Sequence, residues 1–335
     1  MLKKRSKKQI SVLLLSFAVL SGAIFLPVVY SLSDKLSETD RVNANILLVE
    51  GWLPPYALRM AFDEFEKKGY DRIITTGLTS TSDYFNEYTN GYLVFYTSGK
   101  HFKNSEISNH TIEIKAFGSL NGENSAQFNI LINDSIAGNF LADKKKRNYS
   151  VNWKGRLSAI DSVSVQFLND KVGDFGDRNL FVKEIIFDHK ISIPYQLNSI
   201  YTFSEPGRTI KIKNDYISYA QLAENSFLAL GIDSSLIVEI PGKKVSLNRT
   251  LTSALAFRDW LKTSDIKVKG INIVTLGTHA KRTWMTYNKI MDKKYDIGII
   301  SLPDYKSRRS GKYKVFKTLR ETVGIIYYWL ILLPY

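Results

Sequence analysis

The chain of 335 residues contains no cysteine. This absence excludes disulfide bonds, thiolate zinc sites, thiol nucleophiles and a lipid anchor attached through cysteine. Two glycine-rich phosphate-binding patterns, the Walker A motif and the dinucleotide-binding fingerprint, are also missing. A phosphate-bearing ligand would therefore have to be bound without either of these glycine-rich motifs.

The net charge of the chain is +14, and most of it lies in two segments that have basic but no acidic side chains. Five of the first eight residues are Lys or Arg, and residues 306–320 contain seven basic side chains and no acidic one. The rest of the chain is close to neutral. A nucleic-acid-binding protein carries a basic face on its folded body, so we expect no nucleic acid among the partners.

A long uncharged run follows the basic N-terminus, at residues 10–30. As a helix it would be about 31 Å long, enough to cross the hydrocarbon core of a bilayer. The sequence Ser-Leu-Ser at 31–33 is a poor cleavage site, which favours an uncleaved anchor over a secretory signal. We therefore predict a basic cytoplasmic tail and transmembrane helix at 1–33. The protein would pass once through the bacterial inner (cytoplasmic) membrane, with its folded domains on the extracytoplasmic side.

The C-terminal segment 306–335 ends in an apolar, aromatic run at 323–335. Thirteen residues are too few to span a bilayer, but they suit a helix lying at a lipid surface beside basic residues. The alternative is a terminal helix that docks on its own domain. We favour the docked helix.

The middle of the chain alternates apolar and polar residues, for example at 111–116, 149–153 and 162–167. Such alternation, with turn residues between the runs, is typical of half-buried antiparallel strands. We predict an inserted all-β sandwich of the jelly-roll type over residues 92–203.

One loop of this segment is rich in oxygen-bearing side chains: Asn169, Asp170, Asp174, Asp177 and Asn179. Clustered carboxylates repel one another unless a cation lies among them, and Ca²⁺ takes six to eight oxygen ligands. A solvated surface turn explains the same composition, because Asp, Asn and Gly favour turns. The spacing alone leaves both interpretations open.

The pattern Phe-x-Asn-Asp, followed by Asp-Arg-Asn-Leu-x-Val, resembles the signature of calcium-dependent, xylan-binding-type carbohydrate-binding modules. The resemblance covers residues 109–188. It implies Ca²⁺ as cofactor, coordinating sugar hydroxyls, and a polysaccharide or envelope glycan as partner. It also implies Asp170 and Asp177 as the main metal ligands, with Asn169 and Asp174 as further candidates.

Strands and helices alternate in the remainder of the chain, at 40–91 and 204–305. Short apolar strands are expected at 44–49, 72–77, 236–240, 271–276 and 296–300. Helices are expected at 54–68, 216–230 and 249–261, and from 279 onward. This order predicts an α/β Rossmann-like parallel sheet, covered by helices and split by the sandwich.

Ligands of such sheets bind beyond the carboxyl ends of the strands. The residues expected there, or at the start of the following helix, are Glu50, Gly51, Gly77, Arg249, Thr250, Thr275, His279 and Arg282. Helix N-termini together with arginine side chains favour an anion such as phosphate. His279 is the one histidine outside the inserted segment. A lone histidine is more often structural than catalytic, but the position of His279 at a strand end favours the two roles about equally.

Four motifs of these segments resemble the SanA/YdcF/ElyC-like envelope family: Ile-Leu-Leu-Val-x-Gly at 46–51, Ile-Ile-Thr-Thr-Gly at 73–77, Asn-Arg-Thr-x-x-Ser-Ala at 248–254 and Val-Thr-x-x-x-His-Ala-x-Arg-Thr at 274–283. The resemblance implies a Rossmann-like domain behind a membrane anchor and a role in envelope polysaccharide or lipid-carrier metabolism. One branch of the family binds S-adenosylmethionine. Glu50 and Ser253 depart from the family pattern, so the α/β-domain ligand stays unknown.

These features predict a membrane-anchored envelope protein that binds polysaccharide through calcium and acts on or senses a phosphate-bearing or glycan-linked ligand. If the α/β domain is an enzyme, Arg249 and Arg282 would hold the anion. His279 would serve as general acid or base, with Glu50 as a second proton carrier. The alternatives are a non-catalytic scaffold that tethers glycan and a protein that binds S-adenosylmethionine or a nucleotide.

Overall fold

The computed structural model describes residues 26–79, 83–97, 102, 106–120, 124–173, 176–291, 294–305 and 311–335. It divides into two compact units. One comprises Asn45–Lys267, and the other joins the N-terminal segment to Val268–Tyr335.

Three parallel strands lie side by side in the unit Asn45–Lys267. They are β1 (Ile46–Glu50), β2 (Arg72–Leu78) and β16 (Ile237–Gly242), with β2 in the middle. All five residues of β1 are buried, as expected for a parallel strand covered on both faces. The helices of this part are α2 (Pro55–Lys68), α3 (Tyr219–Leu230) and α4 (Arg249–Thr263).

Helix α2 begins and ends where the local sequence requires. Pro55 occupies the first turn, where its missing N–H costs no hydrogen bond. Gly69 closes the helix in the left-handed conformation, with φ of 69°. The helix matches the predicted one to within a residue.

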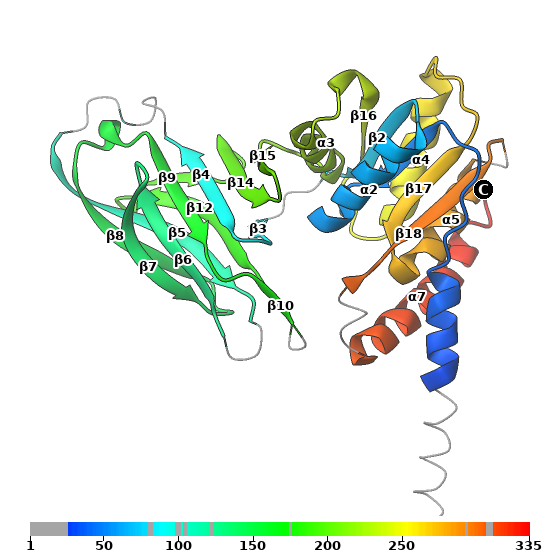
Figure 1. Ribbon diagram of the computed structural model, residues 1–335, viewed down its shortest axis with the longest axis horizontal. Coiled ribbons are helices and arrows are strands. Elements are labelled where there is room, and N and C mark those ends of the chain that lie inside the picture. The colour runs from blue at the N-terminus through cyan, green and yellow to red at the C-terminus, as the bar shows by residue number, and fades with distance from the viewer. Residues whose placement is uncertain are drawn as a thin grey trace, which may run out of the picture. The chain divides into compact units, whose positions relative to one another are not determined.

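An antiparallel sandwich is inserted between β2 and α3 and is built of two sheets (Figure 1). The first sheet has the order β13-β12-β5-β8, with β3 also paired to β12, and the second has the order β15-β14-β4-β9-β6-β7. In chain order the strands of the two sheets are β3 (Phe85–Glu87), β4 (Gly91–Tyr96), β5 (Ser108–Gly118), β6 (Ala126–Ile132), β7 (Ser135–Ala142), β8 (Arg147–Gly155), β9 (Ser162–Phe167), β12 (Leu180–Phe187), β13 (Ile191–Pro194), β14 (Ser199–Glu205) and β15 (Arg208–Lys213).

Aromatic side chains join the two sheets of the sandwich. Phe128 on β6 meets Tyr149 on β8 edge to face at 5.0 Å between ring centroids. Phe85 on β3 meets Tyr201 on β14 at 5.1 Å. These contacts and the alternating burial along β4 confirm the prediction of a sandwich. Its strands extend from Phe85 to Lys213, beyond both ends of the predicted segment 92–203.

The chain enters and leaves the sandwich at neighbouring points. Thr79, directly after β2, forms an isolated antiparallel bridge with Ser218, directly before α3. The Ser218 hydroxyl also accepts a hydrogen bond from the Gln221 backbone N–H at 3.0 Å and so caps α3. The insertion therefore begins and ends at one backbone bridge.

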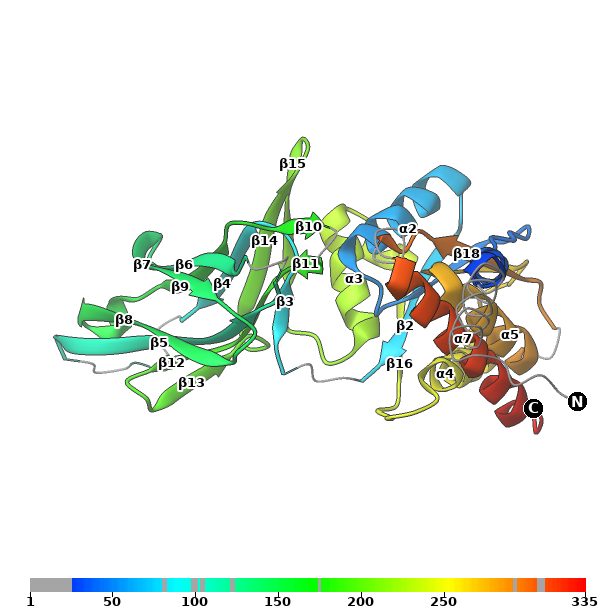
Figure 2. The same ribbon diagram turned by 90° about the horizontal axis from the view of Figure 1, so that it is seen from below.

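The second unit repeats the α/β pattern. Strands β17 (Ile271–Leu276) and β18 (Ile297–Leu302) are parallel and are connected through the short helix η3 (Gly277–His279) and helix α5 (Ala280–Ile290). The long C-terminal helix α7 (Gly311–Ile331) packs against α5 and η3 (Figure 2). Parallel strands with helices thus occur in both units, which confirms the α/β part of the predicted fold class.

The predicted transmembrane helix falls mainly on residues 10–25, which lie outside the described part of the chain. Residues 26–30 of that prediction are described, and residues 26–36 are helical. Within the described residues, no helix combines the length and apolar character needed to cross a membrane.

Candidate functional site

The predicted calcium loop lies between β9 and β12 and folds into a small hairpin. Its strands are β10 (Lys171–Gly173) and β11 (Gly176–Arg178), in which Val172 pairs with Asp177. The fourth predicted ligand, Asp174, lies outside the described residues. The other three predicted ligands, Asn169, Asp170 and Asp177, are described.

Two carboxylates of the loop influence each other. Burial raises the pKa of Asp170 to about 6, and the negative charge of Asp177 adds to this shift. Arg178 and a hydrogen bond from Thr89 act in the opposite direction but do not cancel it. Moreover, the buried Oδ1 atom of Asp170 has no hydrogen-bond partner. A cation beside Asp170 would remove the repulsion and give this oxygen a partner.

The side chain of Asn169 is hydrogen-bonded at both ends of its amide. Its Oδ1 accepts a hydrogen bond from the Gln127 backbone N–H at 2.7 Å, and its Nδ2 donates to the Ser125 carbonyl at 3.0 Å. Both ends of the amide are therefore used to fasten the loop to the start of β6. In this arrangement the amide holds the loop in place while Asp170, the next residue, carries the charge.

Several residues that complete the loop were not among the predicted ligands. Asn179 donates from Nδ2 to Asp177 Oδ2 at 3.1 Å, and its own buried Oδ1 has no partner. Asn90, in the turn between β3 and β4, accepts the backbone N–H of Asp170 at 2.7 Å. Arg178 is buried and donates from Nη1 to the Asn169 carbonyl at 2.9 Å. Asn179 lies in the clustered loop sequence, whereas nothing in the sequence connects Asn90 with a loop that lies about 80 residues away.

The donor set of this loop suits calcium. It contains two neighbouring carboxylates and the amide oxygen of Asn179, all hard oxygen donors. Within the described residues, no three His, Cys, Asp or Glu side chains form a metal-binding group. Backbone carbonyls, amides and the ligand's own hydroxyls would therefore have to fill the remaining positions. An ion with open positions of this kind can hold a sugar directly.

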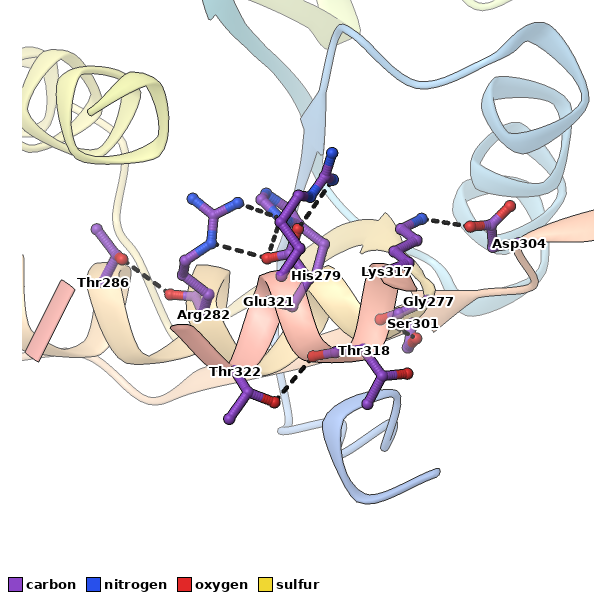
Figure 3. Close-up of polar contacts among 11 residues, drawn as sticks. Gly277, His279, Arg282, Thr286, Ser301, Asp304, Lys317, Thr318, Glu321 and Thr322 are labelled. Atoms are coloured by element: carbon purple, nitrogen blue, oxygen red, sulfur yellow. Dashed lines mark hydrogen bonds and ion pairs between the residues drawn. The ribbon is translucent and has the colours of Figure 1, made fainter. Parts of the chain in front are cut away.

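A second cluster lies at the carboxyl end of β17, in the other unit (Figure 3). Figure 3 shows His279 of η3 and Arg282 of α5 pointing toward Glu321 of α7. Arg282 Nε donates to Glu321 Oε2 at 2.9 Å, and His279 Nδ1 lies 3.3 Å from the same oxygen. Glu321 is 2% exposed. The predicted anion-binding arginine and the predicted acid–base histidine thus contact one carboxylate of the chain itself.

The charge of Glu321 depends on these partners. Burial alone would raise the pKa of Glu321, but the hydrogen bond and charge of His279, together with Arg282, lower it well below its usual range. Arg282 Nη2 also lies 2.8 Å from His279 Nδ1. Since a guanidinium has only donors, Nδ1 accepts from Arg282 when the ring is neutral, and it can donate to Glu321 when protonated. The cluster therefore has two states, which differ by one proton on the His279 ring.

The same end of the unit holds a buried ion pair between Lys317 of α7 and Asp304. Ser301 donates to the Gly277 carbonyl at 3.1 Å. The predicted ligand-binding residue Thr275 is fully buried in β17. Helix α7 thus contributes two charged side chains, Lys317 and Glu321, to a region that was expected to bind an external anion.

The remaining predicted residues belong to the unit Asn45–Lys267. Glu50 is 3% exposed at the end of β1. A Cβ atom on Gly51 would lie 2.1 Å from the Tyr219 carbonyl oxygen, and one on Gly77 would lie 2.6 Å from Tyr219 Cβ. Both glycines are therefore required by the close approach of the first turn of α3. This packing explains them without a ligand.

The loop before α4 presents two further predicted residues. Arg249 is the first residue of α4 and its side chain is exposed, whereas Thr250 is 5% exposed. Asn248 precedes them in the left-handed conformation, with φ of 58°. Of the predicted cationic residues, Arg249 faces solvent and Arg282 is engaged by Glu321.

Comparison with known proteins bears on the sandwich. Among solved structures, the chain is similar to the calcium-dependent module vCBM60, with 16% identity over 28% of this chain and 67% of that one at a TM-score of 0.22. It is also similar to a CBM36 module in complex with calcium and xylotriose, with 18% identity over 30% of this chain and 77% of that one at a TM-score of 0.21. Because these TM-scores are low, the fold is described from the strands given above and not from these structures. No curated protein matched the chain.

A family model gives a match in sequence. It covers residues 111–212, from β5 to β15, and includes the whole calcium loop. This segment of the chain matches the model of the CBM60 family, the calcium-dependent, xylan-binding carbohydrate-binding modules.

Proposed function

We propose that the sandwich binds a polysaccharide through a calcium ion held at the loop of Asp170 and Asp177. The main support is the repulsion between these two carboxylates. Buried side-chain oxygens of Asp170 and Asn179 also have no hydrogen-bond partner. Both residues lie in a segment that matches a calcium-dependent family. Calcium would relieve the repulsion and offer open positions to neighbouring sugar hydroxyls. Xylan is the first glycan to test, because the matched family binds it.

The test is a glycan array probed with the full chain, with and without EDTA. We expect binding to xylan-type or related polysaccharides that is lost in EDTA and restored by added calcium. Asp170→Ala and Asp177→Ala should each abolish it. Asp161→Ala is the matched control, because Asp161 is an exposed carboxylate of the same sandwich, beside β9. Binding that survives EDTA, or that survives the loss of both carboxylates, contradicts the proposal.

We further propose that the chain is anchored in the bacterial inner membrane by residues 10–30, with the sandwich and the α/β segments outside. The support is the uncharged run that follows the basic N-terminus and the resemblance of the α/β segments to the SanA/YdcF/ElyC-like family. In this setting the sandwich would hold envelope glycan close to the membrane. Protease added to intact spheroplasts should cleave the folded domains if this orientation is right.

For the α/β segments, two functions remain as proposals: action on a phosphate-bearing or glycan-linked ligand, and tethering without catalysis. The contacts of Arg282 and His279 with Glu321 favour tethering, since the guanidinium already has an internal carboxylate. Catalysis would require an incoming anion to displace Glu321. Turnover of an envelope precursor that is abolished by His279→Ala would decide for the enzyme.

A further inference from the structure

Helix α7 buries mainly polar residues and exposes most of its large apolar ones. Lys317, Thr318, Glu321 and Tyr328 are its buried residues. The exposed large apolar residues of the helix and of the four residues after it are Tyr313, Phe316, Leu319, Val323, Ile326, Tyr327, Trp329, Leu330, Leu333 and Tyr335. A surface helix of a soluble domain normally shows the opposite distribution.

The orientation of α7 is fixed by its buried charges. Lys317 pairs with Asp304, and Glu321 pairs with Arg282 at 2.9 Å and His279 at 3.3 Å. Turning the helix to bury its apolar face would pull these charges away from their partners and leave them unpaired, which is costly for buried ions. The apolar face is therefore held outward by the ion pairs on the opposite side.

Five of the exposed apolar residues of α7 form one stripe, and Leu333 continues the same spacing just beyond the end of the helix. Phe316, Leu319, Val323, Ile326, Leu330 and Leu333 follow one another at alternating intervals of three and four residues, the spacing of a single helix face. Contiguous apolar surface of this kind marks an interaction site.

A second apolar element lies beside α7. In the helix 26–36, Leu26, Val28 and Tyr30 are 48%, 58% and 38% exposed. Lys314 of α7 joins this helix to α7, because its Nζ lies 3.2 Å from Asp34 Oδ1 and 4.6 Å from the centre of the Tyr30 ring. The exposed apolar surface thus adjoins the end of the uncharged run at residues 10–30.

The chemistry of this surface suits anionic lipid. Glu321 is the one acidic residue in the sequence from 306 to the C-terminus, and it is buried. The exposed face of α7 therefore combines apolar side chains with basic ones, including Lys312 and Arg320. Trp329, Tyr327 and Tyr335 are residues that favour the headgroup region of a bilayer. A helix with these properties lies in the plane of a lipid surface.

We propose that the exposed face of α7, with the apolar residues of the helix 26–36, rests on the surface of an anionic lipid bilayer. The contact would orient the C-terminal unit against the membrane independently of glycan binding. It extends the proposed membrane anchoring, because it assigns a second, peripheral contact to a folded part of the chain.

The absence of cysteine allows a clean test with single cysteine labels. Ile326→Cys places a fluorophore on the stripe, and Ile136→Cys on β7 is the matched control, because both isoleucines are 59% exposed. Each labelled full chain is reconstituted into vesicles of phosphatidylglycerol and phosphatidylcholine. One set of vesicles carries nitroxide-labelled lipid, and another receives iodide in the aqueous phase.

We expect the label at 326 to lose more than half of its emission to the lipid quencher and to be protected from iodide. The label at 136 should show the reverse. Adding Val323→Glu and Leu330→Glu, both at exposed positions, should return the label at 326 to iodide quenching while the far-ultraviolet circular dichroism stays unchanged.

A label at 326 that is as accessible to iodide as the label at 136 would overturn the inference. So would a label protected from both quenchers, since a second copy of the chain would then cover the stripe. Failure of the chain to float with vesicles would overturn the anchor and this contact together. Flotation with an iodide-accessible stripe would overturn this contact alone, and neither result affects the calcium test of the sandwich.

Discussion

Asp170 holds its proton more tightly than a carboxyl in water does, because it is partly buried beside Asp177. A metal ligand must lose its proton before it binds the ion, so calcium and protons compete for this side chain. With the pKa at about 6, the competition begins as the pH falls below that value.

We therefore expect the calcium affinity of the full chain to be constant above pH 7 and to weaken below pH 6, by roughly tenfold per pH unit while one proton is displaced. Calorimetric titration of the full chain with calcium at several pH values measures this affinity directly. Asp170→Asn should weaken binding and flatten the pH profile. A profile that stays steep in Asp170→Asn would show that another group is titrating.

The sequence predicted the two carboxylates of the calcium loop but not how the loop is held. Asp170 and Asp177 were identified by composition and motif, and the structure places them within electrostatic reach of each other. Asn169 was grouped with them because amides are oxygen donors, yet both ends of its amide bond to backbone groups near β6. Such partners come from distant strands, so a local motif cannot reveal them.

Helices and strands were predicted more closely than side-chain roles. Strand β17 has the predicted limits, and the limits of β2 and β16 differ from the prediction by one or two residues. Their apolar runs are short and bounded by glycine or by helix starts, which makes their limits visible in sequence. The C-terminal helix was predicted at 323–335 but begins at Gly311, because its first half is basic and its ion pairs with Asp304, His279 and Arg282 depend on tertiary structure.

The docking of α3 on β1 and β2 depends on glycine. A Cβ on Gly77 would lie 2.6 Å from Tyr219 Cβ and 2.7 Å from the Ala220 nitrogen, so the helix backbone would have to move. We expect Gly77→Ala to lower the free energy of unfolding by about 1–3 kcal/mol, as overpacking does.

The control for this substitution is Gly242→Ala on the neighbouring strand β16. There the new Cβ would be 3.0 Å from Leu78 Cδ2, the end of a flexible side chain that can move. Chemical denaturation measures the free energy of unfolding of both variants, and Gly77→Ala should be the less stable one. Equal stabilities would show that α3 does not require glycine at position 77.

Helix α7 is held by the charge of Glu321. Because its folded-state pKa lies below its unfolded value of about 4.3, Glu321 stabilises the fold above that pH, and the contribution is lost as the pH falls toward the lowered pKa. We expect Glu321→Gln to leave Arg282 and His279 without their carboxylate and to destabilise the docked helix by about 3 kcal/mol.

Amide hydrogen exchange of α7 and η3 at neutral pH measures this loss locally. Arg320→Ala is the control: its guanidinium lies 3.2 Å from Glu321 Oε1, but its side chain is 62% exposed. Such a pair contributes less than about 1 kcal/mol. Faster exchange in Arg320→Ala than in Glu321→Gln would show that the inner ion pairs do not hold the helix.

For the chain as a whole we propose two kinds of recognition. Residues 111–212 match a family of calcium-dependent, xylan-binding modules, and we infer a lipid-facing surface on the C-terminal unit. In the sequence, the acidic loop predicted the first, whereas the basic, aromatic C-terminus favoured a helix docked on its own domain over one at a lipid surface. The sequence could not show that α7 turns its charged side inward, since this orientation depends on Asp304, His279 and Arg282 in other elements.

The bridge between Thr79 and Ser218 also bears on how such a protein arises. A guest domain whose first and last residues are already neighbours leaves the pairing of the host strands undisturbed. Recombination can then add, exchange or delete the guest in a single event, and the carbohydrate specificity of the protein can evolve separately from its α/β framework.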